Sequence, residues 1–157
     1  MRVRRWLGSL DCVVCGQRHP HGMRLRFGVG DAAAEAAWTV DPAFQGFRGV
    51  LQGGMVLAIL DDCMWYAVYG EGAVTLTAEA SVRYRAKVEV GQAVMARATV
   101  ASHRGRLWHC TAELRPAGGG PVLASAEGKF LSVPPSDGDA LLRGTAVHEL
   151  PADLGPQ

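Results

Sequence analysis

Two adjacent aspartates, Asp61 and Asp62, lie inside an apolar stretch that begins at Gly53. Apolar residues on all sides predict a buried helix there, and a carboxylate is costly to bury without a partner. Neighbouring helical residues point about 100° apart, so one aspartate can face a reaction site while the other reaches solvent, a cap or a salt bridge. Two interpretations stay open: a general base or nucleophile, and a helix carboxylate paired with an arginine.

The pair Gly53-Gly54 supplies a complementary group at the helix start. Glycine lets another group approach the backbone closely, and the first N–H groups of a helix lack intrahelical acceptors and lie at its positive end. They can stabilise an oxygen that gains negative charge, although a simple turn or close packing also explains two glycines. Gly53 lies roughly 12 Å from Asp61 along the helix. We therefore expect Gly53 of one subunit to act with Asp61 of another.

Composition limits the classes of function that the chain can have. Its 157 residues suffice for one domain, and 16 basic against 15 acidic residues leave a formal charge of +1. This balance gives no support for binding nucleic acid or a membrane surface. The N-terminus lacks a signal-like apolar run, and no window is long enough to span a bilayer. We expect a cytoplasmic protein with reduced cysteines.

The pattern along the chain predicts an α+β fold. An N-terminal loop segment over 1–22 precedes a domain over 23–133, and a loosely held tail covers 134–157, where Leu141, Leu142 and Val147 could dock a short turn. Alternating and helical periodicities predict strands and one long helix, over 23–29, 36–40, 53–69 (the helix), 74–88, 93–102, 107–115 and 122–133. An apolar helix beside one antiparallel sheet suggests a sheet curled around it. A second subunit would cover the rest of the helix.

A group of possible metal ligands lies near the N-terminus, at Cys12, Cys15, His19 and His21. Thiols and imidazoles bind zinc, but zinc modules typically separate their two ligand pairs further. We expect a structural loop with no metal and no cofactor, and keep zinc binding and thiol redox pairing as alternatives.

Four segments of the chain resemble a known family. GVLQGGMVLAILDD resembles a pattern of His-Gly-Gly, six residues and Asp, which falls here on Gln52, Gly53, Gly54 and Asp61. LTAEASVRYRAKVEVGQ resembles the strand after the family's helix, ASAEGKFLSVP its last strand, and CVVCGQRHPHGMRLRF a Cys-x-x-Cys-Gly lead-in of one branch. Over about residues 12–133 the chain resembles hotdog-fold acyl-CoA thioesterases of the phenylacetate-degradation (PaaI-like) type.

This resemblance implies a hotdog fold, a homodimer or dimer of dimers, and hydrolysis of an acyl-CoA to free acid and CoA without metal or cofactor. By position, Asp61 would be the base or nucleophile, and the Gly53 N–H would polarise the thioester carbonyl. Thr77 would position water or the carboxylate, although a strand threonine is ordinary by itself. Whether Asp61 attacks directly or activates water stays open.

Gln52 departs from the family pattern because most relatives carry His there. A glutamine can orient a loop through hydrogen bonds but cannot exchange protons near neutral pH. Catalysis survives if that His only orients the site. Otherwise the chain would be a non-hydrolytic acyl-CoA binding or sensing module. A hotdog hydratase is disfavoured because this helix has no His, and a purely structural protein is the last alternative.

Five further residues are expected at the substrate site: Gly54, Asp62, Trp65, Arg83 and Arg85. Trp65 could line an acyl pocket, although aromatic residues on a buried helix are usually core. The two arginines alternate on one strand face, from which they could contact CoA phosphates. A solvated strand face is the alternative for them.

Overall fold

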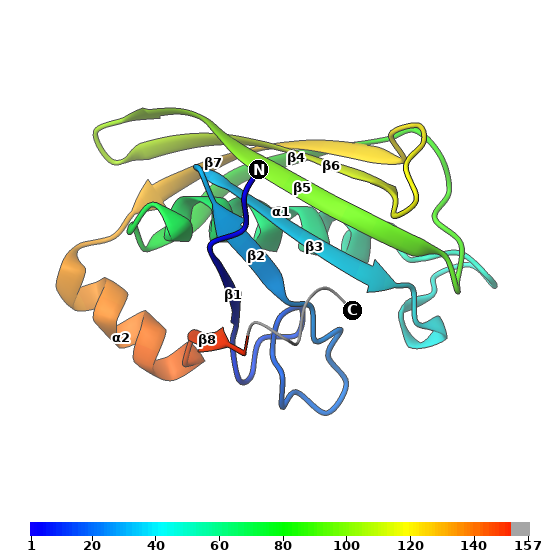
Figure 1. Ribbon diagram of the computed structural model, residues 1–157, viewed down its shortest axis with the longest axis horizontal. Coiled ribbons are helices and arrows are strands. Elements are labelled where there is room, and N and C mark those ends of the chain that lie inside the picture. Colours follow the sequence, from blue (N-terminus) through cyan, green and yellow to red (C-terminus); the bar gives the residue numbers. More distant parts are fainter. Residues whose placement is uncertain (152–157) are drawn as a thin grey trace.

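One antiparallel sheet of eight strands curves around a long helix, α1, and a shorter helix, α2, lies outside it (Figure 1). The computed structural model describes residues 1–151. In chain order the elements are β1 (Arg5–Gly8), β2 (Phe27–Gly30), β3 (Ala33–Thr39), the 3-10 turn η1 (Pro42–Phe44), α1 (Gly53–Gly70), β4 (Thr75–Tyr84), β5 (Ala93–Arg104), β6 (Leu107–Pro116), β7 (Ala124–Ser132), α2 (Pro135–Thr145) and β8 (His148–Leu150). The strand order is β4-β7-β6-β5-β3-β2-β1-β8. Within the described residues, neither helix is long and apolar enough to cross a membrane.

Helix α1 presents one fully apolar stripe to the sheet. Its buried side chains recur every three or four residues, as a helix packed on a sheet requires; they include Val56, Ile59, Leu60, Cys63, Met64, Ala67 and Val68. Full burial of each large aliphatic side chain contributes about 1.5–3 kcal/mol. The opposite side, with Asp61, Asp62 and Trp65, is only partly buried. The predicted helix over 53–69 is confirmed, and so is the sheet curled around it.

The four strands after α1 lie where the sequence predicts them, to within a few residues, except that β4 ends at Tyr84, four residues early. Strand β3 forms although its alanines favour a helix. It pairs with β2 on one side and β5 on the other, so sheet hydrogen bonds and packing outweigh local propensity. The hairpin between β2 and β3 turns at Asp31 and Ala32, both with positive φ, the geometry that tight hairpins need.

The chain ends differ from the sequence prediction. Segment 1–22 contains β1, and 134–157 is not a loose tail as far as residue 151, because α2 and β8 occupy it. Strand β8 pairs with β1, with Trp6 opposite Leu150. These strands are too short to leave a periodic pattern, and only long-range pairing reveals them. The part of the tail over 152–157 lies outside the described residues.

Residues 23–26 are a further correction. The alternation of Met23 and Leu25 with arginines predicts a strand, yet β2 begins only at Phe27. Arg24 has a φ of +59°, which no strand accommodates. Met23 and Leu25 are nevertheless buried, so the apolar pattern correctly indicates which side chains face the core.

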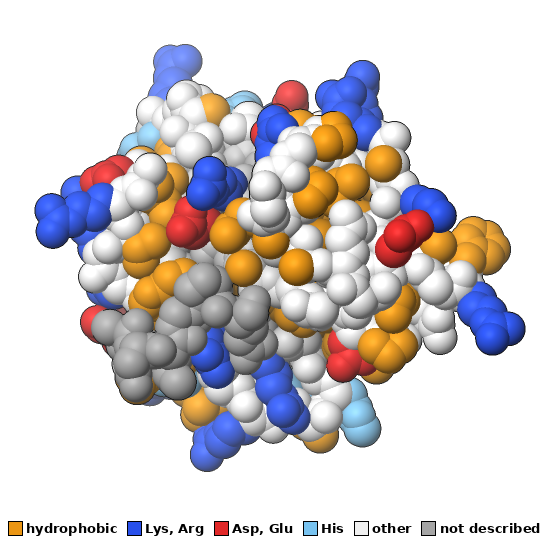
Figure 2. Space-filling view, turned by 45° about the vertical axis from the view of Figure 1, so that its right-hand side comes forward, with side chains coloured by type: hydrophobic (Ala, Val, Ile, Leu, Met, Phe, Trp, Pro, Cys, Tyr) orange, Lys and Arg blue, Asp and Glu red, His pale blue; other side chains and the backbone are white. Residues whose placement is uncertain are grey.

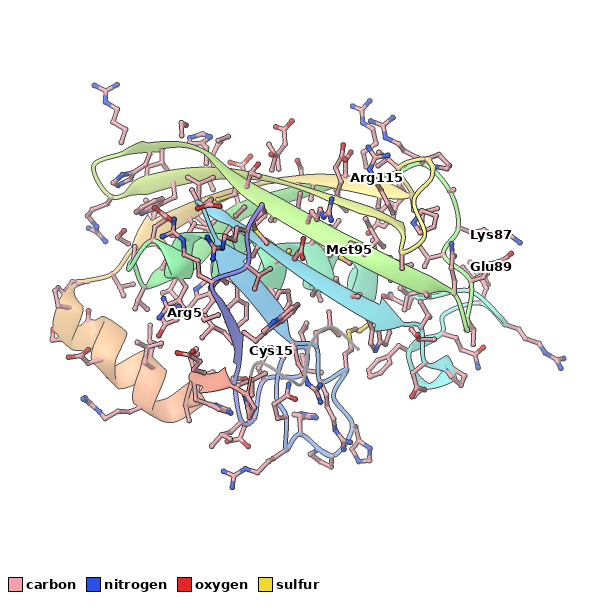
Figure 3. The ribbon with its side chains drawn as sticks, viewed as in Figure 1. Arg5, Cys15, Lys87, Glu89, Met95 and Arg115 are labelled. Atoms are coloured by element: carbon pink, nitrogen blue, oxygen red, sulfur yellow. The ribbon has the colours of Figure 1, made fainter. Side chains whose placement is uncertain are left out.

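Charged side chains are mixed over the surface. On the face shown in Figure 2, basic side chains are interspersed with acidic and apolar ones, as a net charge of +1 predicts. Lys87 and Glu89 pair at 2.6 Å on the loop after β4 (Figure 3). Such an exposed pair contributes little to stability.

We expect Gly128→Ala to destabilise the fold. A Cβ at Gly128 would lie 2.7 Å from Phe130 Cε2 and 2.9 Å from Met64 Cε, between β7 and α1. Overpacking of this kind costs about 1–3 kcal/mol, which denaturant unfolding would measure. Gly118→Ala is the matched control, because a Cβ there meets nothing within 4 Å. Equal stability losses in both variants would contradict this account of the packing.

Candidate active site

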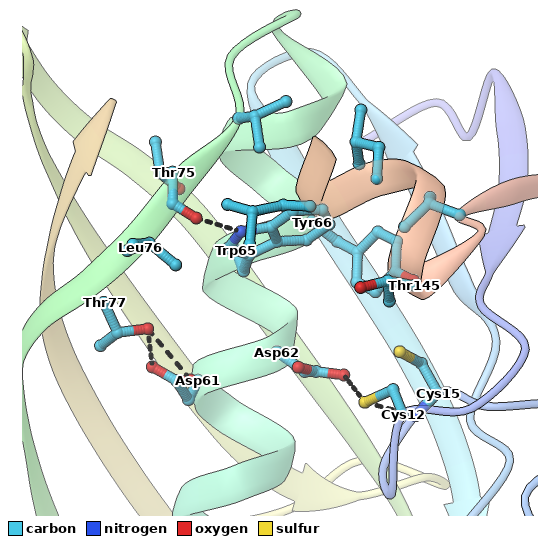
Figure 4. Close-up of a pocket in the computed structure, with 14 residues that line it drawn as sticks. Cys12, Cys15, Asp61, Asp62, Trp65, Tyr66, Thr75, Leu76, Thr77 and Thr145 are labelled. Atoms are coloured by element: carbon cyan, nitrogen blue, oxygen red, sulfur yellow. Dashed lines mark hydrogen bonds between the residues drawn. The ribbon is translucent and has the colours of Figure 1, made fainter. Parts of the chain in front are cut away.

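Asp61 and Thr77 meet between α1 and β4, as the sequence predicts. The Thr77 hydroxyl donates to the Asp61 carboxylate, 3.1 Å from Oδ1 and 3.3 Å from Oδ2 (Figure 4). Strand β4 is bulged at this point, since Thr77 pairs with Phe130 but Glu79 already pairs with Lys129. Bulges redirect side chains and are frequent beside active sites. The bulge therefore sets the direction of the Thr77 hydroxyl, which no local sequence signal indicates.

The environment of Asp61 suits a proton acceptor. Burial raises the pKa of Asp61, and the Thr77 hydrogen bond opposes that rise. Among residues 1–151, no lysine or arginine pairs with Asp61. The alternative of an arginine-paired helix carboxylate therefore has no support in the described part of the chain. A partly buried carboxylate held by one hydroxyl can act as base or nucleophile.

The start of α1 carries two unused donors. Gln52 caps the helix, because its Oε1 accepts from the Met55 N–H at 3.1 Å. The N–H groups of Gly53 and Gly54 have no acceptor among the described residues. Unpaired N–H groups at a helix start stabilise an anionic oxygen. The sequence did not indicate Tyr84, whose hydroxyl donates to the Gly53 carbonyl at 2.7 Å.

Within one chain, these donors and Asp61 lie in different depressions. Asp61 lines a pocket between α1, β4 and α2, whereas Gly53 lines another with Tyr84 and Arg85. The separation agrees with the two helical turns between Gly53 and Asp61. One chain alone therefore does not bring the proton acceptor and the oxyanion donors to the same reacting carbon.

The pocket at Asp61 has a volume of about 250 Å³ and a mainly apolar wall. Trp65 lines it as predicted, and its indole N–H donates to the Thr75 carbonyl at 2.8 Å. Helix α2 supplies Leu141 and Leu142, which lie in the segment that the sequence analysis predicts to be a tail. Their apolar character within a polar segment was the signal for this docking.

Arg83 and Arg85 do not reach the pocket at Asp61. Both are exposed, and with Arg97 they line a shallow groove on the sheet. Arg85 also borders the depression that holds Gly53. Arg85 therefore lies near the helix start, whereas Arg83 lies on the sheet groove alone.

Asp62 faces the N-terminal segment. Its Oδ2 lies 3.7 Å from Cys12 Sγ, a hydrogen-bond contact in which the thiol is the donor (Figure 4). Cys12, Cys15 and Asp62 form one group, and His19 and His21 lie outside it. His19 instead accepts the backbone N–H of His21. The four-residue ligand set that the sequence suggests is therefore not assembled.

Part of the chain is similar to a known protein family. The family described as thioesterase superfamily matches residues 48–123. Among solved structures, a thioesterase superfamily protein designated RHA08564 aligns with a TM-score of 0.72 and 24% identity, over 78% of this chain and 60% of that one. The chain thus spans little more than half the length of that protein. No curated protein matches the present chain.

Two further solved structures share the architecture. The Escherichia coli PaaI protein from the phenylacetic acid degradation operon gives a TM-score of 0.62 at 16% identity, over 66% of this chain and 75% of that one. A hypothetical thioesterase from Streptococcus pneumoniae with coenzyme A gives 0.63 at 13% identity, over 66% and 82%. The fold is the hotdog fold. That prediction is confirmed.

We expect Gln52→Ala to destabilise the chain through loss of the helix cap. Loss of a capping side chain costs about 0.5–2 kcal/mol, and denaturant unfolding would measure it. Gln52→Asn is the matched control, because asparagine is itself a strong capping residue and should restore stability. If Gln52→Ala unfolds at the same denaturant concentration as the native chain, capping is not what Gln52 does.

Proposed function

We propose that this protein is an acyl-CoA thioesterase that works as a homodimer. The observation that carries the proposal is the partly buried Asp61, unpaired with any described cation and hydrogen-bonded by Thr77 beside an apolar pocket. The match to the thioesterase superfamily over residues 48–123 supports the same chemistry. Thioester hydrolysis needs a base or nucleophile and a fixed donor for the developing oxyanion, and α1 carries both.

In the proposed reaction, oxygen replaces sulfur on the acyl carbon. Asp61 either removes a proton from water, whose oxygen then attacks the carbonyl, or attacks the carbonyl itself through a carboxylate oxygen. The oxyanion accepts from the Gly53 N–H of the second subunit. The C–S bond then breaks, and CoA leaves as a thiolate. On the first route the free acid is left, and the thiolate takes up the proton that Asp61 removed from water. On the second route an anhydride of the acyl group with Asp61 is left, and its hydrolysis by water releases the acid, regenerates the carboxylate and supplies the proton. Thr77 keeps the carboxylate oriented.

A second copy of the chain is needed to bring these groups together. Strand β4 is the last strand on its side of the sheet, and it exposes Leu76 (54%) and Tyr84 (51%). An exposed edge with apolar side chains is a ready surface for pairing. We propose that two copies meet along β4 and α1. The helix start of one copy then faces Asp61 of the other. Two such dimers can associate into a dimer of dimers.

The apolar wall of the pocket suits an acyl group, and the arginines suit the carrier. Trp65, Leu76 and Leu141 line the acyl side. The exposed guanidinium groups of Arg83 and Arg85 can bind phosphates of CoA. The hypothetical Streptococcus pneumoniae thioesterase, which shares this fold, was solved with coenzyme A.

A second candidate function rests on Gln52. Its side chain caps α1 and cannot exchange protons as a histidine would. A chain that depended on proton exchange at this position would bind acyl-CoA without hydrolysing it, and would act as a sensing module.

We expect Asp61→Asn to abolish most turnover while substrate binding remains. Loss of a general base lowers the rate roughly 10²–10⁴-fold, whereas the amide keeps the shape of the pocket. Thiol release from a panel of aromatic and aliphatic acyl-CoAs measures turnover, and a non-hydrolysable thioether analogue measures affinity. Asp139→Asn is the control, since Asp139 is an exposed carboxylate on α2.

The native chain decides between the two functions in the same assay. Thiol release that Asp61→Asn eliminates supports the thioesterase. Binding of the analogue without any thiol release supports the sensing module instead. Unchanged turnover in Asp61→Asn would remove Asp61 from the mechanism.

We expect Thr77→Val to lower kcat and Thr77→Ser to retain it. A hydrogen bond to a charged group contributes about 1.5–3 kcal/mol, so its loss should cost roughly ten- to a hundredfold in kcat. Valine matches the shape of threonine but lacks the hydroxyl, whereas serine keeps it. Steady-state kinetics on one acyl-CoA would compare them. Equal rates for both variants would show that the hydroxyl does not assist Asp61.

A further inference from the structure

Three metal-ligating side chains converge on the side of α1 next to the candidate active site. The ligand atoms of Cys12, Cys15 and Asp62 all lie within 4.8 Å of one another. Cys12 Sγ and Asp62 Oδ2 are 3.7 Å apart. A tetrahedral zinc ion with Zn–S near 2.3 Å and Zn–O near 2.0 Å separates a sulfur from an oxygen by about 3.5 Å. The side chains are thus already close to ligation distance.

In the loop that carries the cysteines, backbone N–H groups point at the sulfur of Cys12. The backbone N–H groups of Val14 and Cys15 both donate to Cys12 Sγ, at 3.3 and 3.5 Å. The Gly16 N–H donates to the Cys12 carbonyl at 2.8 Å, and a Cβ at Gly16 would lie 2.3 Å from that oxygen. Only glycine allows this turn. N–H groups that point at a sulfur favour its thiolate, the form that binds metals.

The carboxylate in this group of three side chains lacks a positively charged partner within the described residues. Asp62 has no ion-pair partner among residues 1–151. It lies beside the sulfurs of Cys12 and Cys15 in a pocket whose wall is mainly apolar. A divalent cation would offset two thiolates and a carboxylate, and so remove the cost of placing them together.

A buried hydroxyl supplies an independent observation. Tyr66 is 1% exposed and lines the same pocket wall, yet its hydroxyl has no hydrogen-bond partner within the described chain. Its ring is held by stacking on Phe27, with centroids 4.5 Å apart. A buried hydroxyl without a partner destabilises the fold. A tyrosine hydroxyl can donate to a metal-bound water or thiolate.

We propose that Cys12, Cys15 and Asp62 bind a zinc ion, with a water that accepts from the Tyr66 hydroxyl as the fourth ligand. Two thiolates with one carboxylate favour zinc over magnesium or calcium, which prefer oxygen ligands alone. The site differs from the sequence alternative because Asp62 replaces His19 and His21. It would fasten the N-terminal segment to α1 one residue from Asp61, independently of the reaction proposed there.

The chain of 157 residues, purified under reducing conditions, would be loaded with Zn²⁺ and analysed for bound metal. We expect one zinc ion per chain and, after replacement by Co²⁺, thiolate-to-cobalt charge-transfer absorption. Cys12→Ser and Cys15→Ser should lose at least tenfold in metal affinity, and Asp62→Asn likewise. Cys110→Ser is the matched control, because Cys110 is a free buried cysteine outside the group. The double variant His19→Ala, His21→Ala should bind zinc normally.

Several outcomes would overturn the proposal. They are failure of the native chain to bind either metal, unchanged affinity in the cysteine variants, and loss of binding in the histidine variant. A Cys12–Cys15 disulfide formed by dissolved oxygen once the reductant is removed, in a chain that binds no zinc, would assign a redox pair instead. If the variants do not fold, thiol alkylation of the native chain decides. Zn²⁺ should protect Cys12 and a chelator should remove the protection, whereas alkylation that ignores zinc would rule the site out.

Discussion

Burial of α1 in the curve of the sheet is the constraint on which the rest of the structure depends. Its apolar stripe faces the strands, so any polar group on the helix must lie on the remaining side. Asp61 and Asp62 occupy that side. Because they point in different directions, they meet different partners, Thr77 on β4 and Cys12 on the N-terminal segment. One helix therefore positions two carboxylates in two separate chemical environments.

The sequence predicts this central part well because its signals are local. The length of α1, the strands that follow it and the meeting of Asp61 with Thr77 come from periodicity and from the family resemblance. Gly53-Gly54 likewise marks the helix start, and the structure leaves both N–H groups without described acceptors. Patterns within ten or twenty residues suffice for such features, since burial on one side of a helix or strand imposes its own period.

What the sequence could not predict depends on contacts between distant segments. The pairing of β1 with β8 joins residues near both ends of the described chain, and strands this short have no recognisable period. The contact of Cys12 with Asp62 spans fifty positions, so the cysteines suggested His19 and His21 as partners only because these are close in sequence. The bulge beside Thr77 depends on the register between β4 and β7, which no single strand encodes.

The position of helix α2 beside the pocket at Asp61 affects the size of that pocket. It forms one wall of the pocket at Asp61 but belongs to neither the sheet nor α1 (Figure 1). Leu141 and Leu142 can change in size without moving Asp61 or the hydroxyl that holds it. In the proposed thioesterase, α2 would thus contribute to the acyl pocket without supplying a reacting group, whereas α1 and β4 would contribute to both. Substitutions confined to this short helix would then change the size of the pocket and leave Asp61 and Thr77 in place.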